Sequence, residues 1–133
     1  MKTAVIYWSG TGNTEAMANA VAEGAGVDAV AVSDFSGNVE EFDALALGCP
    51  AMGAEVLEED EFEPFFTGIE GKLSGKKVLL FGSYGWGDGE WMRNWQEECK
   101  GLGIALVADG VIANEAPDDE ATQNCIALGK LLA

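Results

Sequence analysis

The chain has no histidine, and Arg93 is its only arginine. Without histidine it can form neither a Ser-His-Asp triad nor a Cys-His dyad, and it has no histidine to bind a metal. The lone arginine also rules out a Cys-x5-Arg phosphatase centred on Cys49. The composition therefore excludes many hydrolytic and metal-dependent enzyme mechanisms for this protein.

Cysteine is also scarce, with Cys49, Cys99 and Cys125 scattered along the chain. Their number is odd and no two of them form a Cys-x-x-Cys pair, so we expect reduced, mostly buried thiols. Iron–sulfur clusters and structural zinc sites need about four ligands of this kind. The sequence therefore predicts no metal site.

Long apolar runs are missing too. No stretch approaches the roughly 20 residues needed to span a bilayer, and the N-terminus leads directly into a predicted strand. We therefore expect neither a membrane span nor a signal peptide, and a cytoplasmic location by default. At 133 residues, the chain is predicted to be a single domain over residues 1–133 with a full hydrophobic core.

Positive charge is in short supply, because 23 acidic residues face only seven basic ones and the net charge is −16. Such a surface repels nucleic acid and anionic membranes and attracts a basic protein partner. The alternative is that the charge serves general solubility. The uneven placement of the acids, densest over residues 55–63 and again over 118–120, favours a role in partner binding.

Apolar segments alternate with helical patterns along the chain. Strands are predicted at residues 3–8, 27–32, 44–49, 77–83 and 104–107, and the last of these could resume at 111–112. Helices are predicted at residues 15–22 and 90–102, with a short one at 39–42 and a final one from 118–120 to Leu132. We expect Trp91, Trp95 and Leu102 to share one face of the third helix. Several strands are continuously apolar, which predicts a parallel sheet with helices on both faces. Ligands of such sheets bind beyond the carboxyl ends of the strands, where the loops at 9–14, 50–55 and 83–89 should meet.

The first of these loops, residues 9–14, reads Ser-Gly-Thr-Gly-Asn-Thr between a strand and a helix. Hydroxyl groups, close-approaching glycine backbone and helix N-terminal amides make this a cradle for an anion. The loop has no lysine or arginine, which suits a terminal phosphate held permanently. It is neither a Walker loop nor a dinucleotide fingerprint, since Ala16 and Met17 stand where a third glycine is required. An ordinary capped helix remains the alternative.

The third loop places Trp86 between Gly85 and Gly87. A tryptophan isolated between glycines has nothing to pack against within its own segment. It could anchor the loop in the core, but a platform for a planar ligand is the favoured interpretation, because an indole stacks well on a conjugated ring.

Three segments, 7–15, 48–53 and 82–87, resemble the FMN loops of the short-chain flavodoxins of anaerobic bacteria. The likeness runs from Met1 to the final helix, and residues 61–65 and Asn114-Glu115 also match. Three loops in order and at suitable spacing are far more specific than one. The resemblance implies a flavodoxin-like, doubly wound α/β fold with a five-stranded parallel sheet in the order 2-1-3-4-5 and helices on both faces.

The resemblance also implies a role for each matching residue. Ser9, Thr11, Asn13 and Thr14 would hold the FMN phosphate with their amides, and Ser83 would add a hydroxyl. Trp86 would stack on the outer flavin face and Met52 on the inner one, while Glu55 accepts from flavin N3–H. The peptide between Gly53 and Ala54 would face flavin N5, the amides of residues 86–89 the pyrimidine oxygens, and Asn114 the ribityl chain. The full cofactor-binding set is Ser9, Gly10, Thr11, Gly12, Asn13, Thr14, Pro50, Ala51, Met52, Gly53, Glu55, Ser83, Tyr84, Gly85, Trp86, Gly87, Gly89 and Asn114.

The sequence departs from the family in three places. Pro50 and Ala54 replace polar residues found in some relatives, and the segment from Thr14 to Val27 is about one helical turn short. Gly24 and Gly26 should end the first helix early. We expect these changes to adjust potential and stability without preventing FMN binding.

The implied function is that of a low-potential electron carrier and not of an enzyme. It would pass single electrons between redox enzymes as non-covalently bound FMN moves between oxidised, semiquinone and hydroquinone states. Expected partners are basic enzymes, such as oxidoreductases of pyruvate or hydrogen metabolism, with no nucleic acid or membrane involved, and the protein should be a monomer. An FMN-dependent reductase of quinone-like substrates is the alternative, although no segment is left over for a substrate pocket or a nicotinamide site. A signalling receiver domain would need acidic residues where Ser9-Gly10 and Cys49-Pro50 stand.

Overall fold

The computed structural model describes residues 2–52, 57–85 and 87–133. Its sheet is parallel throughout and has the order β2 (Ala29–Ala31), β1 (Thr3–Tyr7), β3 (Ala44–Gly48), β4 (Lys77–Tyr84) and β5 (Ala105–Leu106). A further strand, β6 (Val111–Asn114), also pairs with β4. Because β5 lies beside the start of β4 and β6 beside its end, the two together occupy the fifth position. The predicted order 2-1-3-4-5 is confirmed.

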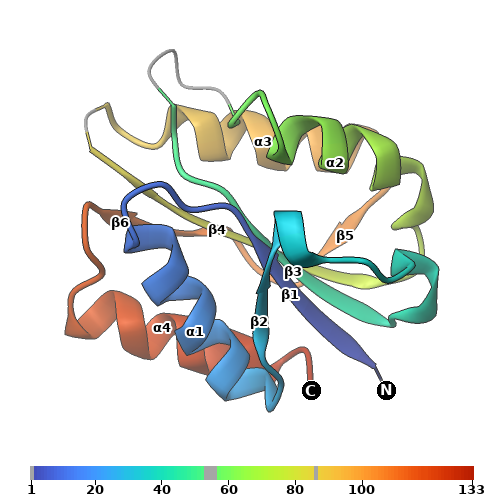
Figure 1. Ribbon diagram of the computed structural model, residues 1–133, viewed down its shortest axis with the longest axis horizontal. Coiled ribbons are helices and arrows are strands. Elements are labelled where there is room, and N and C mark those ends of the chain that lie inside the picture. The colour runs from blue at the N-terminus through green and yellow to red at the C-terminus, as the bar shows by residue number, and fades with distance from the viewer. Residues whose placement is uncertain (1, 53–56, 86) are drawn as a thin grey trace.

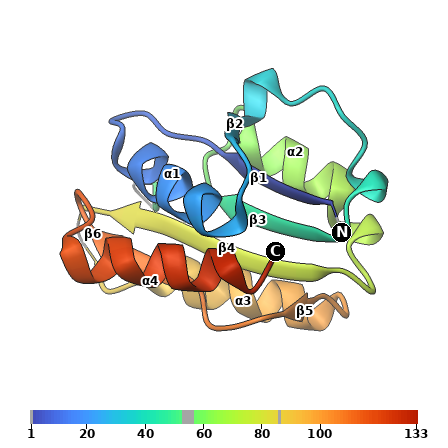
Figure 2. The same cartoon turned by 90° about the horizontal axis from the view of Figure 1, so that it is seen from below.

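Helices cover both faces of the sheet (Figure 1). Figure 2 shows α1 (Asn13–Ala25) and α4 (Asp119–Lys130) side by side on one face, while α2 (Phe62–Ile69) and α3 (Glu90–Gly101) cover the other. Side chains alternate between the two cores, so that Leu45 and Leu47 of β3 face α2 and α3, while Ala44 and Ala46 face α1 and α4. Burial on both faces explains why the central strands lack polar residues.

The helices α1 and α4 approach each other at two glycines. A Cβ atom at Gly24 would lie 2.0 Å from the carbonyl oxygen of Ile126, and one at Gly129 would lie 2.2 Å from that of Val21. Only glycine fits at such distances. The helix α1 then ends at Ala25, where Gly26 adopts φ 76° and its N–H donates to the Ala22 carbonyl at 2.8 Å.

Three sequence-based expectations differ from the structure, and one helix was not expected. The strand expected at 27–32 covers only Ala29–Ala31, after which the chain enters the 3-10 helix η1 (Val32–Asp34). The short helix expected at 39–42 is the 3-10 turn η2 (Val39–Glu41). Leu102 is 43% exposed and so does not share the buried face of α3 with its tryptophans. Finally, the sequence pattern missed α2, which is followed by η3 (Glu70–Lys72), because acidic residues interrupt the apolar period at its start.

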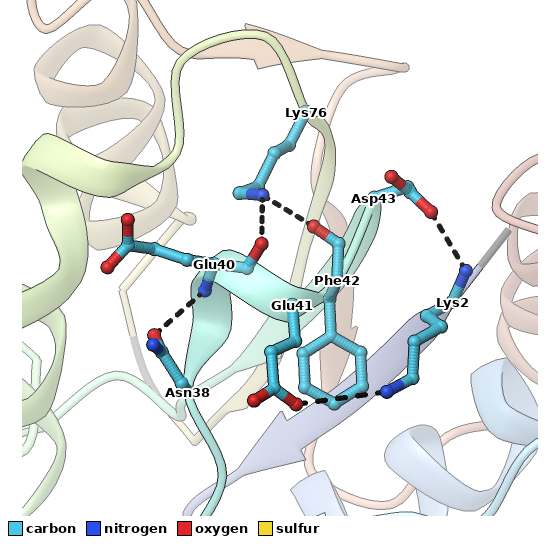
Figure 3. A network of polar contacts seen from close by, with 7 residues as sticks. All are labelled: Lys2, Asn38, Glu40, Glu41, Phe42, Asp43 and Lys76. Atoms are coloured by element: carbon cyan, nitrogen blue, oxygen red, sulfur yellow. Dashed lines mark hydrogen bonds and ion pairs between the residues drawn. The ribbon is translucent and has the colours of Figure 1, made fainter.

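The amino edge of the sheet is closed by lysine contacts (Figure 3). Lys76 Nζ donates to the backbone oxygens of Phe42 at 2.6 Å and Glu40 at 3.3 Å, which ties the entry of β4 to that of β3. The backbone N–H of Lys2 donates to the Asp43 carboxylate at 3.0 Å. These contacts lie at the end of the sheet opposite to the predicted ligand loops.

The three cysteines are free and buried, as expected. Burial raises the pKa of the Cys49 and Cys99 thiols to about 12 and that of Cys125 to about 11, which makes them unreactive. None of the helices in the described ranges has both the length and the apolar character needed to cross a membrane.

Candidate functional site

A cavity of about 500 Å³ opens at the carboxyl edge of the sheet. Its size lies within the range of roughly 300–1,000 Å³ that is usual for small-molecule sites. The lining comes from all three predicted loops and from the end of β6: Trp8, Gly10, Thr11, Asn13, Pro50, Ala51, Met52, Ser83, Tyr84, Gly85 and Glu115. The loops therefore meet where a doubly wound sheet places its ligand.

The first loop leaves the N-terminus of α1 open toward this cavity. Gly12 is the N-cap residue, has φ 95°, and offers no side chain to the amides of the first turn. Its own N–H donates to Ser9 Oγ at 3.0 Å, which holds the loop closed on itself. The 13-residue helix thus presents unfilled backbone donors and its positive dipole end beside neutral side chains. This donor set fits a phosphate.

Thr14 and Ser83 form a buried hydroxyl pair behind the loop. Their oxygens are 2.9 Å apart, and the backbone N–H of Ser83 donates to Thr14 Oγ1 at 3.3 Å. Ser83 also lines the cavity, whereas the side chain of Thr14 is 1% exposed and does not. The pair fixes the start of α1 against the end of β4, and so sets the position of the loop.

The middle of the site is built on close backbone contacts. A Cβ atom at Gly82 would lie 2.2 Å from the carbonyl oxygen of Cys49, and one at Gly48 would lie 2.1 Å from the Phe81 ring. The same Cys49 oxygen accepts from Trp91 Nε1 at 3.1 Å, which anchors α3 to the end of β3. The backbone just before Pro50 is therefore held from two sides.

Trp8 and Glu115 line the cavity although neither was among the predicted cofactor-binding residues. The Trp8 ring covers the loop so closely that a Cβ atom at Gly10 would lie 3.0 Å from it, and Trp8 Nε1 donates to Glu61 Oε1 at 3.4 Å. Glu115 has φ 59°, and its N–H donates to the Tyr84 carbonyl at 2.7 Å. Both residues directly follow a strand, and that position was the signal available in the sequence.

Two glycines shape the end of the third loop. Gly87 has φ 88° and Gly89 has φ 95°, and neither lines the cavity. Between them, Asp88 Oδ1 accepts from Arg93 at 2.9 Å, and its backbone oxygen accepts from the same guanidinium at 3.0 Å. The Arg93 contact holds the pKa of Asp88 below its usual value. Arg93 therefore offsets the negative charge of Asp88.

The acidic run also contains a structural residue. Glu58 is 4% exposed, and its carboxylate accepts from the backbone N–H groups of Asp60, Glu61 and Phe62 at 2.8 Å each. These are donors at the start of α2, so Glu58 fixes the N-terminus of that helix. The role in partner binding that the sequence favours for this acidic run therefore does not extend to Glu58.

Apart from Gly87 and Gly89, the predicted site residues fall into four groups. Nine line the cavity: Gly10, Thr11, Asn13, Pro50, Ala51, Met52, Ser83, Tyr84 and Gly85. Ser9, Gly12 and Thr14 belong to the supporting loop, and Asn114 is exposed at the end of β6, in a neighbouring hollow beside α4. The assignments to Gly53, Ala54, Glu55 and Trp86 lie outside the described residues.

Comparisons with known proteins agree with this geometry. The flavodoxin family model matches residues 5–129. The flavodoxin of Clostridium beijerinckii is 52% identical over 135 residues and covers 97% of each chain, and that of Megasphaera elsdenii is 47% identical over 97% of this chain and 96% of its own. The solution structure of the two-electron reduced Megasphaera elsdenii flavodoxin superposes with a TM-score of 0.85 over 96% of both chains, at 46% identity. The chain therefore belongs to the flavodoxin family and is an FMN-containing, low-potential electron carrier, an electron-transfer protein rather than an enzyme.

Proposed function

We propose that FMN occupies the cavity at the carboxyl edge, with its phosphate at the N-terminus of α1. The observation that carries this proposal is the glycine N-cap at Gly12, which leaves the first-turn amides open toward a 500 Å³ cavity. Glu115 is the one carboxylate among the described lining residues and would repel a phosphate. The phosphate therefore belongs beside the neutral Gly10, Thr11 and Asn13.

Bound FMN supplies the electron-accepting ring, and the residues of the chain bind and orient it. Trp8 shields the phosphate loop from one side, and the Thr14–Ser83 pair supports it from behind. The apolar Pro50, Ala51 and Met52 give the ring a dry wall. The roles inferred for Gly53, Glu55 and Trp86 remain part of this proposal.

The charge distribution supports basic redox enzymes as partners. Six cationic residues lie at the amino edge of the sheet or at helix ends next to it: Lys2, Lys72, Lys76, Lys77, Lys100 and Lys130. The seventh, Arg93, is paired with Asp88. The carboxyl edge carries Glu59, Asp60 and Glu61 on one side and the acidic start of α4 on the other. A basic surface is thus steered toward the FMN end.

We further propose that the protein acts as a monomer in the cytoplasm, delivering electrons singly between two such enzymes. Three free, buried thiols suit a reducing compartment. Enzymes of pyruvate or hydrogen metabolism are candidates suggested by the family resemblance.

Flavin binding by the apoprotein tests the phosphate assignment. Riboflavin lacks the phosphate and so forfeits several charge-assisted hydrogen bonds, each of roughly 1.5–3 kcal/mol. Loss of two such bonds should weaken riboflavin binding at least about 100-fold relative to FMN, as measured by fluorescence titration. Comparable affinities for the two flavins would contradict the assignment.

A further inference from the structure

A second hollow lies between α2 and α3, on the face of the sheet that α1 and α4 do not cover (Figure 1). It has a volume of about 310 Å³, and its lining includes Phe66, Thr67, Asn94 and Trp95. It shares no described residue with the FMN cavity. We call it the α2–α3 groove.

Trp95 in this groove has an unsatisfied donor. The residue is 3% exposed, and its ring meets those of Phe62 and Phe66 edge-on, with centroids 5.5 and 5.8 Å apart. Its Nε1 is buried and has no hydrogen-bond partner among the described residues. Buried donors almost always have an acceptor, and leaving one unpaired costs free energy. The indole N–H is therefore available to an acceptor that enters the groove.

The groove also carries an unbalanced negative charge. Glu63 of α2 and Glu98 of α3 contribute carboxylates from its two walls. Burial and the charges of Glu70 and Glu63 raise the pKa of Glu98. In the described part of the chain, none of these three carboxylates takes part in a salt bridge. A cation between the walls would relieve their repulsion.

We propose that the α2–α3 groove binds an arginine residue of a protein partner. The backbone carbonyl of this arginine accepts from Trp95 Nε1–H, and its guanidinium pairs with Glu63 and Glu98. A simple cation offers no acceptor, and a neutral peptide offers no charge, whereas an arginine within a peptide provides both. Its planar fork of donors also suits two carboxylates better than a lysine ammonium does. Because Nε1 is covered, the groove has to widen slightly as the carbonyl enters.

This inference deepens the proposed function and rests on it for the basic character of the partner. The test uses the oxidised, FMN-loaded, ¹⁵N-labelled protein and N-acetyl-arginine amide as the probe. We expect a saturable shift of the Trp95 indole resonance, which Trp95→Phe identifies by removing it. Glu63→Gln combined with Glu98→Gln should weaken the probe about three- to fivefold. Trp95→Phe should weaken binding of the probe about two- to tenfold, which is the effect of losing one neutral hydrogen bond. Binding to this variant is followed by the resonances of other residues of the groove.

The control is Glu23→Gln combined with Asp28→Asn, which removes the same charge outside the groove and near the amino edge, and should leave the dissociation constant unchanged. Equal weakening by this control, or no saturable shift of Trp95, would overturn the proposal. Equal binding of putrescine, a cation without a carbonyl, would overturn it as well. FMN content and the salt dependence of electron transfer are measured on the same samples. If both are normal while the probe fails, only the groove proposal fails; if transfer does not depend on salt, the basic-partner proposal fails.

Discussion

The Glu58 carboxylate lies beneath the first turn of α2, where it accepts three backbone hydrogen bonds. Burial by itself raises the pKa of Glu58, but the amides of Phe62, Glu61 and Asp60 outweigh it and bring the pKa below the ordinary value of 4.5. A residue from the middle of an acidic run thus stabilises the N-terminus of α2.

Glu58→Gln should lower the free energy of unfolding by about 1–3 kcal/mol, because an amide has one acceptor oxygen where three donors need partners. The native pKa is depressed, so the contribution of the ionised side chain is fully present above pH 4.5 and is lost as pH falls through the native pKa. Urea unfolding of wild type and variant across the acid range would measure this contribution.

The difference in free energy of unfolding between wild type and variant should narrow at low pH. The adjacent, exposed Glu59→Gln is the control and should change stability by less than about 0.5 kcal/mol. A gap that stays constant with pH would contradict the role assigned to ionised Glu58.

Gly12 has open space around its Cα atom but a left-handed backbone. Gly12→Ala should therefore destabilise the protein by about 1–2 kcal/mol through backbone strain, and should weaken FMN more than riboflavin because the first-turn amides move. Gly12→Asn should recover part of both losses, since asparagine tolerates this conformation better than alanine. Flavin titration and urea unfolding of the two variants would test this. Equal losses for alanine and asparagine would show that backbone conformation at Gly12 is not the limiting factor.

At the scale of elements, the packing of α1 on α4 positions the loop at residues 9–14, because α1 begins within that loop. Gly24 and Gly129 allow the two helices to approach at backbone distance. The resemblance to flavodoxins indicated that the first helix is short, and the structure shows that this helix packs against α4.

Gly24→Ala and Gly129→Ala should each destabilise the protein by about 1–3 kcal/mol, because the new methyl group meets a backbone oxygen that cannot turn away. FMN binding should weaken as α1 shifts. Gly68→Ala is a matched control inside α2, where a Cβ atom meets nothing within 4 Å. It should raise stability by up to about 1 kcal/mol. Denaturant midpoints measure the stability of all three variants. Destabilisation of similar size in the control would show that the close contact between α1 and α4 is not the cause of the loss.

At the scale of the molecule, lysines gather at the amino edge of the sheet. The carboxyl edge carries acids, such as Glu59 and Asp60, that form no salt bridge within the described ranges. The resulting asymmetry should orient the protein as it approaches a basic enzyme, with the FMN end leading. Glu58 and Asp88 contribute less than their sequence positions suggest, because each is already satisfied by neighbours.

Glu59→Gln combined with Asp60→Asn should therefore flatten the salt dependence of electron transfer with a basic redox protein. The rate constant at low salt should fall several-fold, while that at high salt should be unchanged. Glu23→Gln combined with Asp28→Asn removes the same charge near the amino edge and should leave the slope intact. Stopped-flow measurements over a range of ionic strength would separate the two. Equal slopes for both variants would mean that net charge matters and its placement does not.

Many features of the fold and of the candidate site could be predicted from local patterns in the sequence. Continuously apolar strands indicate a sheet buried on both faces, and the three loops at their carboxyl ends are local patterns of glycine, hydroxyl and aromatic residues. Local patterns of this kind depend on neighbours within a few residues, and a sequence displays them directly. Hence these patterns predict the parallel sheet and nine residues of the cavity lining, while the strand order and the family were implied by the resemblance of the loops to those of flavodoxins.

Other features depend on residues far apart in sequence, and only the tertiary structure decided them. Gly24 meets Ile126 and Thr14 meets Ser83, pairings that no local pattern encodes. Glu58 looks like any other member of an acidic run until the start of α2 turns its amides toward it. Whether a charge is solvated or satisfied, and whether a glycine gives freedom or space, is set by what the fold brings within hydrogen-bonding or van der Waals distance.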